Sequence, residues 1–439
     1  MTTLNYKYEV RLDMWMRVLV AAMLFVLSFI GSAAHATPPN VVMIISDDQG
    51  WTDYGFMGHE QIRTPRLDQL AKESALFRRG YVPSSLCRPS LATLVTGLYP
   101  HQHKISGNDP AGKRGARGNE LREQLIAHID NVPTLPRLLA TKGYLSLQTG
   151  KWWEGNYRRG GFTHGMTRGF PEKGGRHGDD GLTIGRKGMK PIIDFIHTAE
   201  EQEKPFFIWY APFMPHTPHN PPERLSKKYV DAGATRKDAA YYAMCEWFDE
   251  TVGQLLDHLA DRNLEDNTLI VYVTDNGWKQ GSAGSQLRGG KRSPYEGGIR
   301  TPIMLRWPRH VKPGDYDAAV SSIDLVPTIL SACDLKPTAN MQGRNLLLAA
   351  NGEELSRDTI FGETFAHDVA DIDHPARSLQ YRWAIEDARW KLILDAESKN
   401  RELYDLSTDP HEKNNVASSK PDIVRRLTGK LDAWWTPRL

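Results

Sequence analysis

Three short hydrophobic runs in the chain lack the polar alternation of a strand with one exposed face. They are Val41–Ile45, Phe206–Tyr210 and Leu269–Val273. Runs of this kind are typical of strands covered on both faces, as in a parallel sheet between layers of helices. Between the second and third runs, apolar residues recur at helical spacing from Phe248 to Leu259, and Asn263 closes that segment. Strands that alternate with helices predict an α/β sandwich.

The last hundred residues follow a different pattern. The segment Tyr381–Leu394 predicts a β-hairpin with its turn near Glu386-Asp387, and an amphipathic helix is expected around Ile423–Trp435. We therefore predict a main domain of residues 37–345, followed by a smaller C-terminal α+β domain of residues 346–439.

The first 36 residues have the organisation of a secretory signal peptide. Lys7, Arg11 and Arg17 precede the apolar run Val18–Ile30, and small residues end at Ala34-His35-Ala36. The alternative is an uncleaved membrane anchor, but the run is shorter than the ~20 apolar residues of a spanning helix. We predict cleavage after Ala36, export to the periplasm or the medium, and no membrane span in the mature chain.

Composition excludes several classes of protein. The 439 residues suffice for one very large domain or two unequal ones, and 40% hydrophobic residues can bury a core. With 55 Lys and Arg against 53 Asp and Glu, the net charge of +2 argues against a nucleic-acid-binding protein, which would need a basic excess. The three cysteines are too few for a disulfide framework.

Polar residues that follow the three buried runs are the first candidates for chemistry. The residues concerned are Asp47 and Asp48, then His216 and His219, then Asp275 and Asn276. Ligands of open α/β sheets collect beyond the carboxyl ends of the strands. Carboxylate and amide oxygens together suit Ca²⁺ or Mg²⁺ rather than zinc. The alternative is that Asp47 or Asp48 merely caps a helix or turn.

Cys87 is the candidate nucleophile. Pro89 suits a first helical turn and Gly97 suits a helix end, so Cys87 is expected at a helix N-terminus, where the dipole favours an anion. Basic Arg88 lies beside it. The alternative is a buried structural thiol.

The segment Lys151–Lys190 has no periodicity of its own. It contains eleven glycines and nine Lys or Arg residues against four acidic ones. A long loop of this kind is usually functional or disordered. The positive charge favours an anionic ligand, and a solvated flexible loop is the alternative.

The motifs of the chain resemble, in order, those of the type I, formylglycine-dependent sulfatases of the alkaline phosphatase superfamily. They are Asp47-Asp48-Gln49-Gly50, Thr64-Pro65-Arg66-Leu67-Asp68, Cys87-Arg88-Pro89-Ser90, Thr96-Gly97-Leu98-Tyr99-Pro100, Gly150-Lys151-Trp152, Pro215-His216-Thr217-Pro218, Asp275-Asn276-Gly277, Gly290-Lys291, Tyr295-Glu296-Gly297-Gly298-Ile299-Arg300-Thr301-Pro302 and Glu402-Leu403-Tyr404-Asp405-Leu406. The resemblance implies an alkaline phosphatase-like fold, in which helices sandwich a large mixed, mostly parallel sheet. It also implies a short antiparallel sheet in the C-terminal domain.

The resemblance also implies a mechanism. Cys87 would be oxidised by a formylglycine-generating enzyme, and one hydroxyl of the hydrated aldehyde would attack sulfur to give a covalent sulfo-enzyme. The second hydroxyl would then lose its proton, so that the aldehyde re-forms and sulfate leaves. One Ca²⁺ per chain would be bound by Asp47, Asp48, Cys87, Asp275 and Asn276. Lys151, His216 and Lys291 would grip the sulfate, with His216 or Lys291 as proton donor to the leaving oxygen, and with Cys87 they would be the catalytic residues.

Two positions depart from the family pattern. Leu91 stands where the family usually has an Arg that steadies the modified side chain, and Trp153 stands where it usually has a His. Tryptophan cannot accept a proton, so another base would be needed. Four histidines are candidates for this base, with an ordinary surface position as the alternative for each: His101, His103, His164 and His177. His219, three residues beyond His216, is expected either at the surface or in contact with the substrate.

The leading hypothesis is an exported Ca²⁺-dependent sulfatase that hydrolyses a sulfate monoester of a sulfated polysaccharide or oligosaccharide. One alternative is a phosphodiester or phosphonate monoester hydrolase with the same nucleophile. The other is a relative that binds sulfated glycans without turnover, motivated by Leu91 and Trp153.

Overall fold

The computed structural model describes residues 37–112, 115–277, 287–353, 355 and 357–438. The predicted signal peptide, residues 1–36, lies outside the described residues. Pro39–Leu439 form one compact unit. The domain boundary between residues 345 and 346 stays a prediction.

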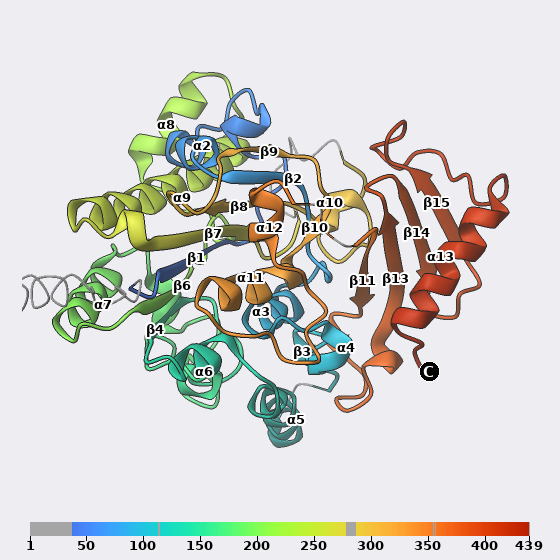
Figure 1. The fold of residues 1–439 in the computed structure, drawn as a ribbon, viewed down its shortest axis with the longest axis horizontal. Coiled ribbons are helices and arrows are strands. Elements are labelled where there is room, and N and C mark those ends of the chain that lie inside the picture. Colours follow the sequence, from blue (N-terminus) through green and yellow to red (C-terminus); the bar gives the residue numbers. More distant parts are fainter. Residues whose placement is uncertain (1–36, 113–114, 278–286, 354, 356, 439) are drawn as a thin grey trace, which may run out of the picture. The chain divides into compact units, whose positions relative to one another are not determined.

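The centre of this unit is a nine-stranded mixed sheet (Figure 1). Its path runs β10 (Val320–Ser321), β2 (Ala75–Tyr81), β8 (Arg300–Arg306), β7 (Thr268–Thr274), β1 (Asn40–Ser46), β6 (Phe206–Ala211), β4 (Leu145–Gly150) and β5 (His164–Gly165), and β9 (Gly314–Tyr316) pairs with β2 off this path. Pairing is antiparallel where β8 meets β2 and β7, and parallel elsewhere. The predicted mixed, mostly parallel sheet is confirmed.

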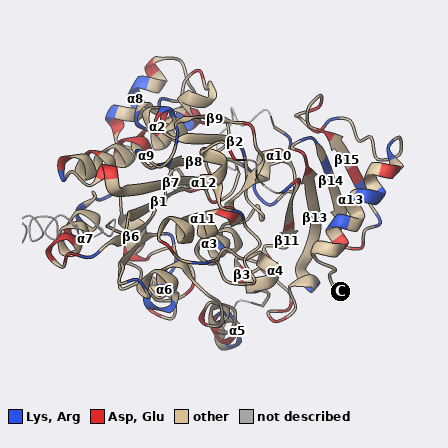
Figure 2. Ribbon diagram, in the orientation of Figure 1, with Lys and Arg blue, Asp and Glu red and all other residues tan. Residues whose placement is uncertain are grey.

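Both faces of the sheet are covered by helices, as the unbroken hydrophobic runs predict. In β1, Val41, Met43 and Ile45 join one core cluster, and Val42 and Ile44 join the other. The first cluster receives side chains of α3, α6, α11 and α12, and the second those of α2, α7 and α9. Figure 2 shows charged residues on outer helices such as α7 and α8, whereas β1, β6 and β7 contain none.

The α-helices of the described residues are α2 (Pro65–Lys72), α3 (Cys87–Thr96), α4 (Pro100–His103), α5 (Gly115–Ala127), α6 (Leu135–Ala140), α7 (Lys190–Glu201), α8 (Glu223–Asp231), α9 (Arg236–Asp261), α10 (Glu296–Ile299), α11 (Leu325–Ala332), α12 (Leu346–Ala350) and α13 (Pro421–Trp434). Helix α9 contains the predicted apolar stripe but begins earlier, because the Thr235 hydroxyl accepts a hydrogen bond from the Asp238 N–H. No helix of the described part of the chain is long and apolar enough to cross a membrane.

The C-terminal region forms a four-stranded antiparallel sheet, with the order β11 (Thr359–Phe365), β13 (Leu379–Glu386), β14 (Trp390–Asp395) and β15 (Arg401–Asp405). The predicted hairpin is β13 and β14, and Asp387 and Ala388 adopt positive φ in its turn. The predicted last helix is α13, which packs Val424, Leu427 and Leu431 against this sheet. Both predictions are confirmed.

A further sheet has two short strands, β3 (Asp109–Pro110) and β12 (Asp368–Val369), which pair in parallel. It joins the chain just after α4 to the loop that follows β11. Gly107 permits this close approach, because a Cβ there would lie 2.7 Å from Val369 Cγ2 and 2.8 Å from the His367 carbonyl oxygen.

Candidate active site

Four neighbouring parallel strands deliver the predicted site residues to one edge of the sheet. Asp47 and Asp48 follow β1, Asp275 and Asn276 follow β7, Lys151 follows β4, and His216 follows β6. Ser46 of β1 lies opposite Thr274 of β7, so the two acidic segments leave the sheet at the same level. Parallel pairing thus places residues far apart in the sequence at one edge.

Cys87 and Lys291 complete the site from the neighbouring part of the sheet. Cys87 is the first residue of α3, which follows β2, as its sequence context predicts. Lys291 lies in the segment before α10 and β8, and its Nζ donates to Cys87 Sγ at 2.7 Å. Both side chains are almost fully buried.

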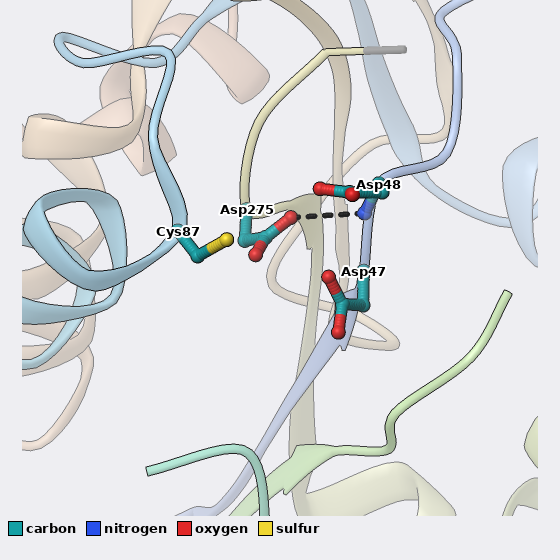
Figure 3. A group of neighbouring side chains, drawn as sticks. All are labelled: Asp47, Asp48, Cys87 and Asp275. Atoms are coloured by element: carbon teal, nitrogen blue, oxygen red, sulfur yellow. Dashed lines mark hydrogen bonds between the residues drawn. The ribbon is translucent and has the colours of Figure 1, made fainter. Parts of the chain in front are cut away.

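Three carboxylates lie close to the Cys87 side chain. Asp47, Asp48, Cys87 and Asp275 each offer a ligand atom, and these atoms all lie within 4.8 Å of one another (Figure 3). The Asp48 N–H donates to Asp275 Oδ1 at 3.1 Å, and Asn276 Nδ2 donates to Asp48 Oδ1 at 2.6 Å. Asp48 adopts positive φ, which turns the chain sharply after β1.

The buried polar atoms of this cluster fit a divalent cation. Asp47 Oδ2, Asp48 Oδ2 and Asn276 Oδ1 are buried and have no hydrogen-bond partner. Such groups are costly to bury unless a partner binds them. An all-oxygen set of two carboxylates and an amide, with Asp275 beside it, suits a hard cation such as Ca²⁺ or Mg²⁺. The residues present therefore fit the metal ion that the resemblance implies.

The charges of the site lead to the same conclusion. Lys151 Nζ lies 2.5 Å from Asp47 Oδ1 and 3.0 Å from Asp275 Oδ2, and Lys291 pairs with Asp48. Three carboxylates against two ammonium groups leave one negative charge uncompensated. Burial raises the pKa of Asp47, and burial together with the charges of Asp47 and Asp48 outweighs Lys151 and raises the pKa of Asp275 to about 6. A bound cation would supply the missing positive charge.

Gly150 determines where Lys151 lies. Its φ is +76°, and a Cβ at this position would lie 1.8 Å from the Ala211 carbonyl oxygen. The Lys151 N–H donates to that same carbonyl at 2.7 Å. Any larger residue at position 150 would therefore displace Lys151 from the carboxylates.

His216 faces the cluster from the β6 loop. Its ring stacks on Phe213 with centroids 4.3 Å apart, and its Nε2 lies 3.5 Å from Asp48 Oδ2. Burial and the charge of Lys151 lower the pKa of His216 to about 4. His219, by contrast, packs near Tyr241.

The two departures from the family pattern have different surroundings. Leu91 is buried in the hydrophobic core beside Val95, so α3 gains packing there rather than a cation. Trp153 lies against His177 with ring centroids 5.4 Å apart, and the Arg176 guanidinium lies over its ring. His177 is thus the candidate histidine whose ring contacts Trp153.

The other candidate histidines are engaged elsewhere. His101 pairs with Glu363 and stacks on Trp435, and His103 is fully buried, which lowers its pKa to about 3. His164 contacts the ring of Phe195.

The basic segment 151–190 contains two 3₁₀ turns, η3 (Tyr157–Gly160) and η4 (Asp180–Thr183), in addition to β5. Several of its arginines bind protein groups: Arg159 pairs with Asp130, Arg176 with Asp109, and Arg186 binds the Phe213 carbonyl. Much of the positive charge of this segment therefore serves internal contacts.

A buried ion pair that the sequence did not indicate lies beside Cys87. Arg88 binds Glu154 through two hydrogen bonds of 2.7 Å, and the two side chains are only 2% and 3% exposed. The pair joins the start of α3 to the segment that carries Lys151. The residues that precede Glu154, Trp152 and Trp153, do not predict that the Glu154 side chain turns towards α3. The pair therefore could not be predicted from the sequence.

Removal of Glu154 is expected to destabilise the fold. In Glu154→Ala the Arg88 guanidinium would stay buried without its counter-ion, which typically costs about 3–5 kcal/mol. Thermal or denaturant unfolding would measure the loss. Asp231→Ala, which breaks the exposed Lys227–Asp231 pair, is the control and is expected to cost less than about 1 kcal/mol. Equal unfolding midpoints for the two variants would contradict this prediction.

A buried cysteine beside a carboxylate cluster, with two lysines and a histidine nearby, fits a hydrolase that acts on anionic esters. Comparison with known families makes the assignment specific. The family model Sulfatase matches residues 39–335, and the model "N-sulphoglucosamine sulphohydrolase, C-terminal" matches residues 289–434. The chain belongs to the sulfatase family.

Individual relatives agree with this assignment. Human arylsulfatase A is 28% identical over 91% of this chain and 88% of its own length. Human N-acetylgalactosamine-6-sulfatase is 30% identical over 72% of this chain and 66% of its own length. The crystal structure of Ps i-CgsB superposes with a TM-score of 0.74 and 26% identity, covering 91% of this chain and 94% of that one. The protein is a sulfatase, and the predictions of family, fold and enzymatic activity are confirmed.

Proposed function

We propose that this sulfatase is exported, depends on Ca²⁺, and removes sulfate from a sulfated polysaccharide or oligosaccharide, with Cys87 converted to formylglycine. One observation carries the proposal: Cys87 Sγ lies within 4.8 Å of a carboxylate oxygen from each of Asp47, Asp48 and Asp275, and Lys291 contacts it. A thiol that was merely structural would not require three carboxylates and a lysine around it.

The residues of the chain would bind the sulfate ester and stabilise its charge. Formylglycine supplies a hydrated aldehyde as covalent nucleophile, and Ca²⁺, held by Asp47, Asp48, Asp275, Asn276 and residue 87, supplies a Lewis acid. Asp275 and Asp47 outweigh burial and raise the pKa of Lys151, and Cys87 together with Asp48 outweighs burial and raises the pKa of Lys291, so both ammonium groups stay protonated. Their ammonium groups therefore offer positive charge to the sulfate oxygens.

His216 and Lys291 are the candidates for the proton that the leaving alcohol needs. Lys291 is charged and in contact with residue 87. His216 is largely neutral near pH 7, because burial and Lys151 depress its pKa, but a dianionic transition state would favour its protonation.

The substrate class is proposed from relatives. Human N-acetylgalactosamine-6-sulfatase is named for a sulfated sugar, and Ps i-CgsB has been crystallised with k-i-k-neocarrahexaose. Both likenesses extend over most of this chain. A sulfated carbohydrate is therefore the substrate that we propose.

The proposal of export rests on the predicted signal peptide. N-terminal sequencing of the mature protein tests it, and Thr37 is expected as the first residue.

The test of the proposal combines mass analysis with rate measurement. The peptide that contains residue 87 is analysed in protein made by its native host, and rates are compared on an aryl sulfate and an aryl phosphodiester. An aldehyde at position 87 and faster hydrolysis of the sulfate are expected. A thiol at position 87 in active enzyme would contradict the formylglycine proposal, and faster hydrolysis of the phosphodiester would favour the alternative esterase.

A further inference from the structure

Asn108 lies beside the nucleophile position, although no motif includes it. The residue precedes β3, and its side chain is largely buried, with 9% exposure. Its Nδ2 faces Cys87 Sγ at 3.9 Å, on a contact separate from the one that Lys291 makes. In the modified enzyme this sulfur position is where a formylglycine oxygen would be bonded to Cβ.

The backbone of Asn108 is fixed from several sides. Its N–H donates to the His367 carbonyl at 2.9 Å, beside the β3–β12 pairing. Its carbonyl oxygen accepts hydrogen bonds from Arg88 Nη1 and Arg176 Nη2, both at 3.2 Å. Arg88 is itself held by Glu154. Asn108 therefore cannot move away from residue 87 without breaking a buried network.

The orientation of the Asn108 amide follows from its neighbours. The Arg88 backbone N–H can only donate, and it lies 3.1 Å from Oδ1. The oxygen of the amide must therefore face Arg88, which leaves Nδ2 with its two hydrogens on the side of Cys87 and His367.

His367 accepts one of these two hydrogens. Its Nδ1 lies 2.6 Å from Asp368 Oδ1, and a carboxylate can only accept, so the ring proton is on Nδ1. When the second ring nitrogen carries no proton, Nε2 is an acceptor, and it lies 3.4 Å from Asn108 Nδ2. The second hydrogen of Nδ2 is left for residue 87.

We propose that Asn108 donates a hydrogen bond to the hydrated formylglycine at position 87 and steadies it for attack, with His367 and Asp368 as positioning residues for the Asn108 amide. This inference rests on the proposed function. It explains how the site tolerates Leu91, whose buried apolar side chain offers no donor. The donor comes from a different element, and the Arg88–Glu154 pair holds it in place.

The decisive variant is Asn108→Asp. It keeps the shape of the side chain and an acceptor for the Arg88 N–H, but it replaces the N–H that faces residue 87 by an acceptor. The kcat of the modified fraction is expected to fall about 100-fold, as for loss of a preorganised donor at a reacting centre. KM should change little, because the lost contact is to the enzyme's own nucleophile. Asn108→Ala is expected to lose less, because it adds no negative charge.

Two comparisons separate this role from a structural one. Asn119→Asp, on an exposed part of α5, is the matched control and should retain the kcat and KM of the parent enzyme. His367→Phe removes the acceptor that orients the amide and should lower kcat, and His367→Gln, which offers an amide oxygen, should restore part of it. All variants are compared at equal formylglycine content, measured by peptide mass, and their melting temperatures are recorded.

The outcomes distinguish this inference from the function on which it rests. If the parent enzyme carried no formylglycine, the proposed function would fail and this inference with it. A modified, active parent with an Asn108→Asp variant of unchanged kcat would overturn the inference alone. A variant that lost only its formylglycine content, with normal turnover per modified molecule, would also overturn it, since Asn108 would then act in maturation.

Discussion

Replacement of Cys87 by Ala is expected to abolish sulfate release, with a loss of at least about 10⁴-fold in kcat, because no nucleophile would remain at the start of α3. The two lysines and His216 would still bind the sulfate ester. Binding of an inhibitory anion should therefore survive while turnover does not. Sulfate release from an aryl sulfate measures the loss.

The fold of the Cys87→Ala variant should remain intact, because alanine fits the first turn of α3 and leaves only a small cavity in a polar site. Cys333→Ala is the matched control. It removes another buried thiol, at the end of α11, and should retain activity. Activity of Cys87→Ala near the parent level would show that residue 87 is not the nucleophile.

Replacement of Asp275 by Ala is expected to remove both bound calcium and activity, with a loss of about 10³-fold or more in kcat/KM. Asp275 accepts hydrogen bonds from the Asp48 N–H and from Lys151, so its loss also removes one contact of the segment after β1 and one of the two carboxylate contacts of Lys151. Metal content by elemental analysis, before and after dialysis against a chelator, measures the first effect.

Two further variants sharpen the interpretation of Asp275→Ala. Asp275→Asn keeps the side-chain shape but removes a charge, and it should bind calcium more weakly than the parent enzyme. Asp334→Ala removes a carboxylate whose side chain is 99% exposed, and it should leave metal content and rate unchanged. If Asp275→Ala retained the calcium content of the parent, Asp275 would not be a metal ligand.

The hydrophobic pattern was sufficient to predict the central layers of the fold. Val41–Ile45, Phe206–Tyr210 and Leu269–Val273 are apolar on both faces, and such strands are stable only between two layers of helices. The same pattern predicted that Asp47, Asp48, Asp275 and Asn276 would meet, because the carboxyl ends of parallel strands share an edge. Neighbouring residues in the sequence also predicted that Cys87 begins a helix. In the same way they predicted where the β13–β14 hairpin turns.

Strand order was beyond the reach of the sequence. Lys151 faces Asp47 because β4, β6, β1 and β7 are neighbours in the sheet, and hydrophobic runs carry no information about which strands pair. The choice among the histidines was equally undetermined. His101 pairs with Glu363, across 262 positions of sequence, whereas His177 reaches Trp153 through a loop without periodicity.

The sequence by itself determined the class of fold, the family, and the residues at the sheet edge. The spacing of hydrophobic residues, the residue types at turns and the order of the motifs can all be read directly along the chain. Only the tertiary structure decided what surrounds Cys87. Asn108 and His367 are 259 positions apart, and neither is distinguished by its neighbours in the sequence. They meet because the two-residue strands β3 and β12, which lie in loops far apart in the sequence, pair with each other. The orientation of the Asn108 amide depends in turn on the folded positions of Arg88, Glu154 and Asp368.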